Sequence, residues 1–337
     1  MAFSAIIKPS DYFFTKLWTG NNTAQTITGI PFAPDFVWIK NRSAAESHTL
    51  VNTSVGANNF LKSNATSANN TNTEFVKSFT SDGYTLGSAD EVNNGSNNIV
   101  GWNWKANGAG ATNEDGSINT IKTSASTASG FSVGTWTGNG SASTIGHGLG
   151  VAPAVVMVKN TSEVYGWQVY HQAIGATKYI ALNDVDSEQT SSQSWNNTAP
   201  TSTVFTVGAS DSNNKNGNVI LFYAFSEIQG YSKFSSFKGN GNADGTFVYT
   251  GFKPAFIMAK KTSGAGDNWF IFDSKRAGYN VDNNYLHPDT NGAEGTSDYL
   301  DIVSNGFKLR TTGGDLNGSG ATYIYMAFAE TPFVANS

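Results

Sequence analysis

The sequence contains no cysteine, which excludes disulfide bonds, thiolate catalysis and thiolate metal sites. Charged residues make up only 13%, about half of the usual share. The net charge of -5 argues against binding to nucleic acid or anionic lipid, both of which require a basic face. No apolar run approaches the roughly 20 residues that span a bilayer. Residues 1–9 lack the basic start of a signal peptide, so we expect a soluble protein made in a cytoplasm.

Glycine, asparagine, serine and threonine are abundant, and they favour turns. The hydrophobic share of 39% and the aromatic share of 13% are sufficient to offset chain entropy by forming a core. No segment combines a sustained 3.6-residue apolar period with helix caps. We therefore predict an all-β protein with little helix, and 337 residues allow two or three domains.

One stretch of sequence occurs three times. Each copy begins with an aromatic residue and Gly-Asn, and it continues to a proline followed by a short apolar run that ends in lysine. The copies span residues 18–40, 136–159 and 237–260. Pro34 lies 119 residues before Pro153, which lies 101 residues before Pro254. Each apolar run after the proline is typical of a strand packed on both faces.

Later landmarks keep these offsets within two residues. They are the aromatic sets Tyr84, Phe205, Phe307 and Trp104, Phe225, Phe328. Self-similarity at a nearly fixed period indicates tandem repeats. The sequence thus predicts three β-sandwich repeats of jelly-roll type, over residues 1–108, 109–230 and 231–337. A flexible composition near residue 108 predicts that the first repeat is tethered more loosely than the other two.

The strand that closes each repeat alternates between two faces. The first face carries a large apolar residue at nine places: Val100, Trp102, Trp104, Leu221, Tyr223, Phe225, Ile324, Met326 and Phe328. We predict that this face is the core of each repeat. The opposite face is also apolar in the second and third repeats, at Phe222 and Tyr325. That face either forms an oligomer interface or packs inside its own domain.

These motifs carry a resemblance to a known family. The segments that show it are Trp136 to Gly140, His147-Gly148-Leu149-Gly150, Ala199 to Gly208, Gly251 to Phe256 and Ser304 to Arg310. The pattern is similar to tandem-repeat structural proteins of tailed bacteriophages, common in marine phages and prophages, which carry a β-rich domain of uncharacterised function. The resemblance covers about residues 10–333 and implies a virion component, most plausibly of the tail or its fibres. It supplies no catalytic or binding residue.

The sequence has no clear catalytic or metal-binding motif. The four histidines form no His-x-x-x-His or His-x-His pair, and neither a Gly-x-Ser-x-Gly elbow nor a phosphate-binding loop is present. We interpret the densest acidic group as solvated loop acids; it comprises Asp267, Asp273, Glu294, Asp298 and Asp301. The stretch from Asp211 to Gly217 resembles a calcium loop but has Lys215 at a ligand position, so we interpret it as an ordinary loop. We predict no catalytic residue, cofactor or metal.

Aromatic side chains on a polar β surface can stack on sugar rings. Some aromatic residues break the repeat pattern and are the candidate glycan contacts: Tyr165, Trp167, Trp195, Trp269, Tyr279 and Tyr285. Trp102 and Trp104 match core positions of the other repeats and are excluded on that ground.

The sequence therefore favours a non-enzymatic virion protein of the tail or tail fibre that attaches to a host-surface glycan. It would be exposed on the particle and contact other virion proteins. A head decoration or connector protein is the alternative, and a glycan-degrading tailspike is a third. Adhesion gains from several weak sites, so we expect a homotrimer, although no coiled-coil heptads are present to drive it.

Overall fold

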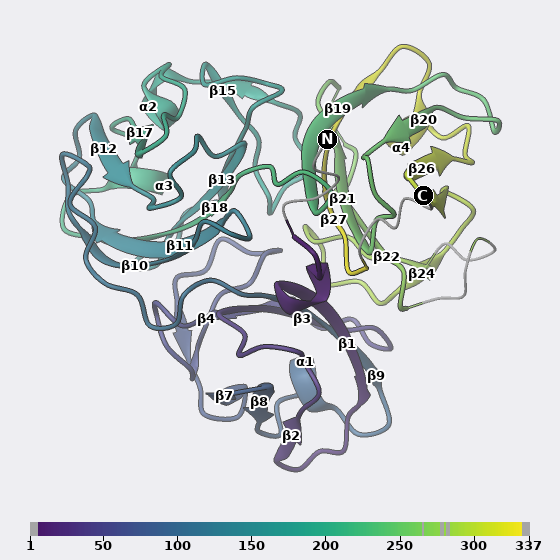
Figure 1. Cartoon of the computed structure of the whole chain (residues 1–337), viewed down its shortest axis with the longest axis horizontal. Helices are drawn as coiled ribbons and strands as arrows, with labels where there is room; N and C mark the ends of the chain where they lie inside the picture. Colours follow the sequence, from purple (N-terminus) through teal and green to yellow (C-terminus); the bar gives the residue numbers. More distant parts are fainter. Residues whose placement is uncertain (1–5, 265, 277–279, 281–283, 332–337) are drawn as a thin grey trace.

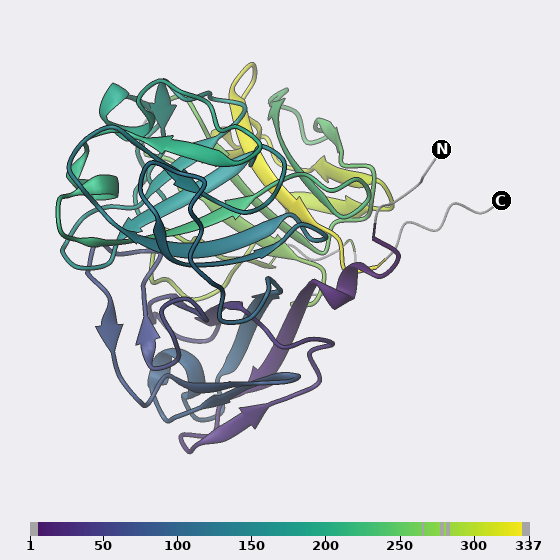
Figure 2. The same cartoon turned by 60° about the vertical axis from the view of Figure 1, so that its left-hand side comes forward.

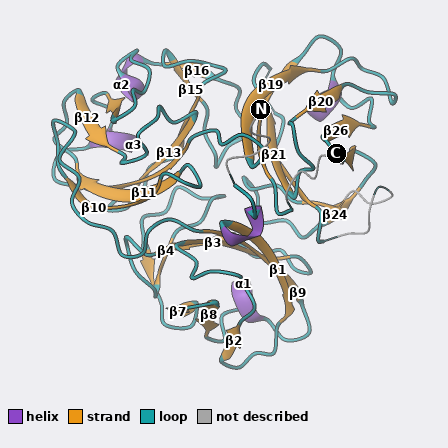
Figure 3. Ribbon diagram, viewed as in Figure 1, coloured by secondary structure: helices purple, strands orange, loops and turns teal. Residues whose placement is uncertain are grey.

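The computed structural model describes residues 6–264, 266–276, 280 and 284–331. Strands dominate, and the few helices are single turns (Figure 3). The chain forms three lobes around a common centre, in the order of the sequence (Figure 1). In the turned view, the first lobe lies below the other two (Figure 2). The predicted all-β class with little helix is confirmed at this level: the described residues are mostly strand, and the large sheets are antiparallel.

The first lobe contains the 3-10 turn η1 (Pro9–Asp11) and the helix α1 (Asp90–Asn93). Its strands are β1 (Phe13–Thr19), β2 (Gln25–Ile27), β3 (Phe36–Asn41), β4 (Thr49–Asn52), β5 (Asn59–Phe60), β6 (Asn70–Thr71), β7 (Val76–Thr80), β8 (Gly83–Leu86) and β9 (Asn98–Trp104).

The second lobe contains the helices α2 (Ser192–Trp195) and α3 (Asp211–Asn214). The second helix lies where the sequence predicted a plain loop. The strands are β10 (Thr120–Ser126), β11 (Phe131–Thr137), β12 (Ser143–Gly146), β13 (Val155–Asn160), β14 (Gln168–His171), β15 (Lys178–Tyr179), β16 (Gln189–Thr190), β17 (Val204–Val207) and β18 (Val219–Phe225).

The third lobe contains the helix α4 (Gly314–Asn317). Its strands are β19 (Ser232–Lys238), β20 (Phe247–Tyr249), β21 (Phe256–Lys261), β22 (Phe270–Asp273), β23 (Asn284–Tyr285), β24 (Gly295–Thr296), β25 (Leu300–Val303), β26 (Gly306–Leu309) and β27 (Thr322–Phe328).

Each lobe has one large sheet that faces the centre. Their strand orders are β1-β9-β3-β4, β10-β11-β18-β13-β14 and β19-β27-β21-β22. A smaller sheet lies outside each one, ordered β2-β8-β7, β12-β17 and β20-β26-β25. The strands β3, β13 and β21 each begin two residues after the prolines at 34, 153 and 254, because a proline cannot donate to the ladder of a central strand.

Apolar side chains form four buried clusters. Three of them lie between the large and small sheet of a lobe, as with Val37 and Ile39 against Tyr84 and Leu86 in the first. The fourth contains residues of all three lobes, and we call it the central core. It is rich in aromatic rings: Phe36 stacks on Tyr223 with ring centres 4.1 Å apart.

The nine positions predicted as core are all buried, but they belong to the central core and not to the interior of each lobe. The opposite face, with Phe222 and Tyr325, packs inside its own lobe. The first face therefore lies between lobes and not inside one, whereas the alternative that the second face packs inside its own domain is confirmed. Both faces of these strands are apolar, so alternation could not show which neighbour each would meet.

Gly83 begins β8 and Gly306 begins β26, each directly after a hairpin turn. Gly83 has a φ of +159°, which is nearly extended, and Gly306 lacks a left-handed φ. A Cβ at Gly83 would lie 1.8 Å from the carbonyl oxygen of Ile27, and one at Gly306 would lie 2.0 Å from that of Val248. These glycines permit close approach of the neighbouring strand, and no turn residue there requires positive φ.

Candidate functional site

An extensive set of polar contacts among the described residues lies where the lobes meet. In each lobe, one side-chain ring nitrogen lies within hydrogen-bond distance of a backbone carbonyl oxygen of a neighbouring lobe. Trp167 Nε1 donates to Lys62 O at 2.9 Å, and Trp269 Nε1 donates to Ala181 O at 2.8 Å. His48 Nε2 lies 3.0 Å from His287 O. The second lobe thus contacts the first, the third contacts the second, and the first contacts the third.

A second set of contacts joins the same three pairs of lobes around the central core. Asn52 Nδ2 donates to the hydroxyl of Tyr223 at 3.0 Å. His171 Nε2 lies 3.2 Å from Tyr325 O. Trp102 Nε1 donates to Asp273 Oδ2 at 2.9 Å. Burial of these groups makes each hydrogen bond costly to lose, because an unpaired polar atom in the core is not rehydrated.

Backbone bonds complete the ring of inter-lobe contacts. Their donors are Asn69, Glu188 and Glu294, and their acceptors are the carbonyl oxygens of Thr161, Thr262 and Arg42, at 2.8, 3.0 and 2.8 Å. The first lobe therefore contacts both neighbours through buried groups, so the predicted loose tether of the first repeat is wrong.

Charges strengthen the junction of the third lobe with the first. Arg42 Nη2 lies 2.7 Å from Glu294 Oε1, and Arg276 Nη1 lies 2.9 Å from Glu294 Oε2. Arg276 also pairs with Asp273 at 2.5 Å, and both side chains are fully buried. Asp273 and Glu294 are therefore not the solvated loop acids that the sequence predicted, because a buried carboxylate requires such partners.

Three lysines at equivalent positions have fully buried side chains. Burial lowers the pKa of Lys40 and Lys159 to about 8 and also lowers that of Lys260, whose acidic neighbours oppose the shift. Lys159 Nζ donates to Thr66 O of the first lobe at 3.2 Å. Lys260 Nζ donates to Val185 O of the second lobe at 2.9 Å. The amines of Lys159 and Lys260 thus hold loops of the preceding lobe, whereas Lys40 Nζ donates to Ala44 O of its own lobe at 3.1 Å. All three are buried and are not exposed nucleophiles.

The third lobe has a carboxylate where the others have an amide. Asn64 Oδ1 accepts from His48 N, and Asn183 Oδ1 accepts from Trp167 N. Asp289 Oδ1 accepts from Trp269 N at 3.2 Å in the same way. Among the described residues, Asp289 Oδ2 has no hydrogen-bond partner. Burial raises the pKa of Asp289 to about 7.

Three of the predicted glycan contacts are buried. Trp167 and Trp269 are each 1% exposed and lie in the central core, at the inter-lobe contacts described above. Trp195 is 2% exposed; it ends the short helix α2 and packs on Tyr170 with ring centres 6.0 Å apart. In this conformation, none of the three presents a ring face to solvent.

The other predicted contacts do not form one site. Tyr165 is half-buried, and its hydroxyl donates to Asp211 at 3.1 Å and accepts from Lys215 at 3.2 Å. Tyr285 is half-buried in the third lobe, against His287 and Tyr299. Tyr279 lies outside the described residues. The structure brings no two of the described candidates into contact.

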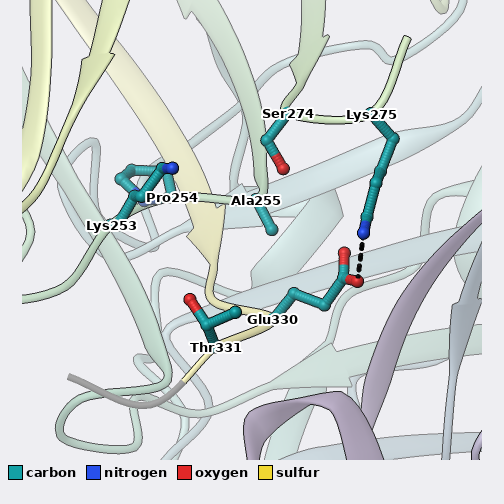
Figure 4. Close-up of a pocket in the computed structure, with 7 residues that line it drawn as sticks. All are labelled: Lys253, Pro254, Ala255, Ser274, Lys275, Glu330 and Thr331. Carbon is teal, nitrogen blue, oxygen red and sulfur yellow. Dashed lines mark ion pairs between the residues drawn. The ribbon is translucent and has the colours of Figure 1, made fainter. Parts of the chain in front are cut away.

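A pocket of about 190 Å³ lies beside the ends of β21, β22 and β27 (Figure 4). Lys275 Nζ and Glu330 Oε1 are paired across it at 2.9 Å, and Lys253 lies on the other side. Burial raises the pKa of Glu330. The volume is below the roughly 300 Å³ of the smallest usual ligand pockets, and a pair of opposite charges occupies its polar side. We assign no ligand to it.

Neither a metal-binding cluster nor a membrane-spanning helix is present among the described residues. Across the described residues, no group of three or more His, Asp or Glu side chains could hold a metal ion. His147 and His171 are buried, and burial lowers their pKa. Within the described part of the chain, no helix has the length and apolar character needed to cross a membrane.

Sequence reasoning missed two aromatic residues that are exposed. Phe247 and Tyr249 on β20 are 46% and 64% exposed. The residues at the corresponding ladder positions of the other two lobes are small, and this difference is the signal that could have singled out Phe247 and Tyr249. A second feature missed on an outer sheet is a shallow hollow of about 370 Å³ in the first lobe, lined by Gln25, Thr26 and Thr85 among others.

The fold and these contacts define a β-rich protein of antiparallel sheets whose lobes share one aromatic core. A family described as a domain of unknown function (DUF7483) matches residues 8–332, and the chain belongs to this family. No curated protein matches the sequence.

Proposed function

We propose that the protein is a non-enzymatic structural component of a tailed-bacteriophage virion, in the tail or a tail fibre, which presents its lobes to a host-surface glycan. The observation that supports this best is the ring of inter-lobe contacts. It joins the first lobe to the third as well as to the second, which suits a rigid part of a particle. The sequence resemblance to phage structural proteins supports the proposed location.

We further propose that the chain consists of three tandem β-sandwich repeats, of jelly-roll type, over residues 1–108, 109–230 and 231–337. In support, the three large sheets place their strands in one order: first, last, third and fourth strand of the repeat, with an extra edge strand in the second. The contacts of His48, Trp167 and Trp269 recur at the repeat spacing.

We also propose a homotrimer, but its subunit contacts would not involve the face that carries Phe222 and Tyr325. Phe222 and Tyr325 are 0% and 2% exposed within their own lobes, so they are unsuited to an oligomer interface. The outer surfaces of the lobes are the alternative. Light scattering of the purified protein at several concentrations, together with copy number per attachment point on the particle, tests this part.

The location is tested on particles of the phage or prophage that encodes the chain. Peptide mass spectrometry of purified virions should detect the protein, and immunogold labelling should mark the tail. Labelling of the head would favour a decoration or connector protein instead. Release of oligosaccharides from host polysaccharide by the purified protein would favour a tailspike. Absence of the protein from virions contradicts the proposal.

A further inference from the structure

The outer sheet of the third lobe exposes two aromatic rings side by side. Phe247 and Tyr249 lie two residues apart on β20, with the buried Val248 between them. Residues at this spacing point to the same face of a strand and are separated by about 7 Å along it. The strand lies at the edge of the sheet and on the side of the lobe away from the molecular centre (Figure 1).

The fold does not require aromatic residues at these places. Val248 pairs with Phe307 in the third lobe, just as Ile27 pairs with Tyr84 and Ile145 with Phe205. This register equates Phe247 with Thr26 and Thr144. It equates Tyr249 with Thr28 and Gly146. Only the third lobe places large rings on this solvent-facing row, although exposed apolar surface brings no benefit to folding.

Polar groups surround the two rings. Lys308 lies opposite Phe247 in the ladder, and Asp301 lies beyond it. Lys308 Nζ is 2.5 Å from Asp244 Oδ1, and Arg310 Nε is 2.5 Å from Asp301 Oδ2. These ion pairs hold the carboxylates as hydrogen-bond acceptors, and the cationic side chains as donors, beside Phe247 and Tyr249.

The ladder position beside Tyr249 is a glycine and therefore carries no side chain. Gly306 pairs with Tyr249 across the ladder, and Val303 follows on β25. A Cβ on Gly306 would lie 3.1 Å from Cε2 of Phe247, so the ring of Phe247 lies against the bare backbone. No side chain therefore rises between the aromatic pair and β25 at this row.

We propose that this face binds a carbohydrate, with Phe247 and Tyr249 stacking on sugar rings while Asp301 and Lys308 hydrogen-bond to hydroxyl groups. The proposal rests on the glycan attachment proposed above and gives it a place in the chain. The size of the patch favours a sugar over a protein partner. From their exposed fractions, the two rings offer roughly 200 Å², far below the about 800 Å² that each partner of a stable protein interface contributes.

The test compares the full chain with a double variant, Phe247→Thr with Tyr249→Thr, which installs the residues of the first lobe. A matched control, Ile121→Thr, removes another exposed apolar side chain, on β10 of the second lobe. Each protein is applied to a printed array of bacterial surface polysaccharides. The polysaccharides bound by the unaltered chain are then titrated by calorimetry, and thermal melting verifies that all three proteins fold.

We expect the double variant to lose at least about tenfold in affinity, which corresponds to about 1.4 kcal/mol, while Ile121→Thr binds as the unaltered chain does. Equal binding by the double variant overturns this site but leaves glycan attachment standing. Absence of polysaccharide binding by the unaltered chain overturns both. Capture of a protein partner through Phe247 and Tyr249, without glycan binding, also overturns the assignment.

Discussion

Trp102 in the first lobe donates its indole N–H to Oδ2 of Asp273 in the third, at 2.9 Å, although 171 residues separate the two in the sequence. The same carboxylate accepts from Arg276, which in turn contacts Glu294. Glu294 pairs with Arg42 of the first lobe. The first and third lobes are thus joined through one network of buried charges, and its disruption should lower the stability of the whole molecule.

Glu294→Gln tests this network. The substitution leaves the fully buried guanidinium of Arg276 with one charged partner in place of two, and it also removes the partner of Arg42. We expect a loss of roughly 3 kcal/mol in the free energy of unfolding, as for a broken buried pair. Urea denaturation measures it. The control is Glu163→Gln, which breaks an exposed, solvent-screened pair with Lys215 and should change stability far less. Equal effects would contradict the role of the network.

Phe225→Ala tests the central core. The ring lies 4.9 Å from that of Phe131 and 5.7 Å from that of Phe328, so it contacts its own lobe and the next. We expect a loss of about 3–5 kcal/mol, as for deletion of a buried aromatic side chain. A loss below about 1 kcal/mol, the scale of a surface substitution, would show that the lobes do not share this core in solution.

Trp167→Phe tests a single inter-lobe hydrogen bond. Phenylalanine keeps most of the buried ring but leaves Lys62 O without its donor. The expected cost is about 1–3 kcal/mol, as for an unsatisfied buried acceptor, measured by thermal melting. Tyr165→Phe is the control, because it removes a hydroxyl near the surface and should change stability by less than about 0.5 kcal/mol.

Asp289→Asn tests the odd carboxylate in the third lobe. Its pKa rises from 3.8 in the unfolded chain to about 7 in the folded protein, so the folded state binds the proton more tightly. The stability that this proton gives is fully present below pH 3.8 and is lost as the pH rises through about 7. We expect the variant to be more stable than the unaltered chain by about 1–3 kcal/mol at pH 8 and nearly equal to it at pH 4.

The reciprocal change, Asn183→Asp, serves as the matched variant in the second lobe. It places a carboxylate where the side chain accepts from Trp167 N at 2.7 Å. We expect Asn183→Asp to be less stable than the unaltered chain, by an amount that grows as the pH rises above neutral. Denaturation midpoints from pH 4 to pH 8 measure both variants. Parallel pH profiles for the two variants and the unaltered chain would exclude titration at this position.

Much of the architecture could be predicted from local pattern. The apolar runs after Pro34, Pro153 and Pro254 indicated β3, β13 and β21, because short apolar segments bounded by proline and polar residues favour strands. The alternation around Trp102 and Phe225 correctly indicated buried positions. The candidate binding residues were predicted less well, since a break in the repeat pattern shows that a residue differs and not where it lies.

The sequence by itself determined the β-rich class, the main strands and the large side chains that must leave water, because these depend on residue type and on spacing along a few residues. Only the tertiary structure decided what those side chains meet. Trp167 is buried in the central core, where its indole N–H donates to Lys62 O of another lobe, whereas Phe247 remains exposed at a sheet edge. The face of a strand is fixed by its own alternation, but burial depends on chain that arrives from about a hundred residues away.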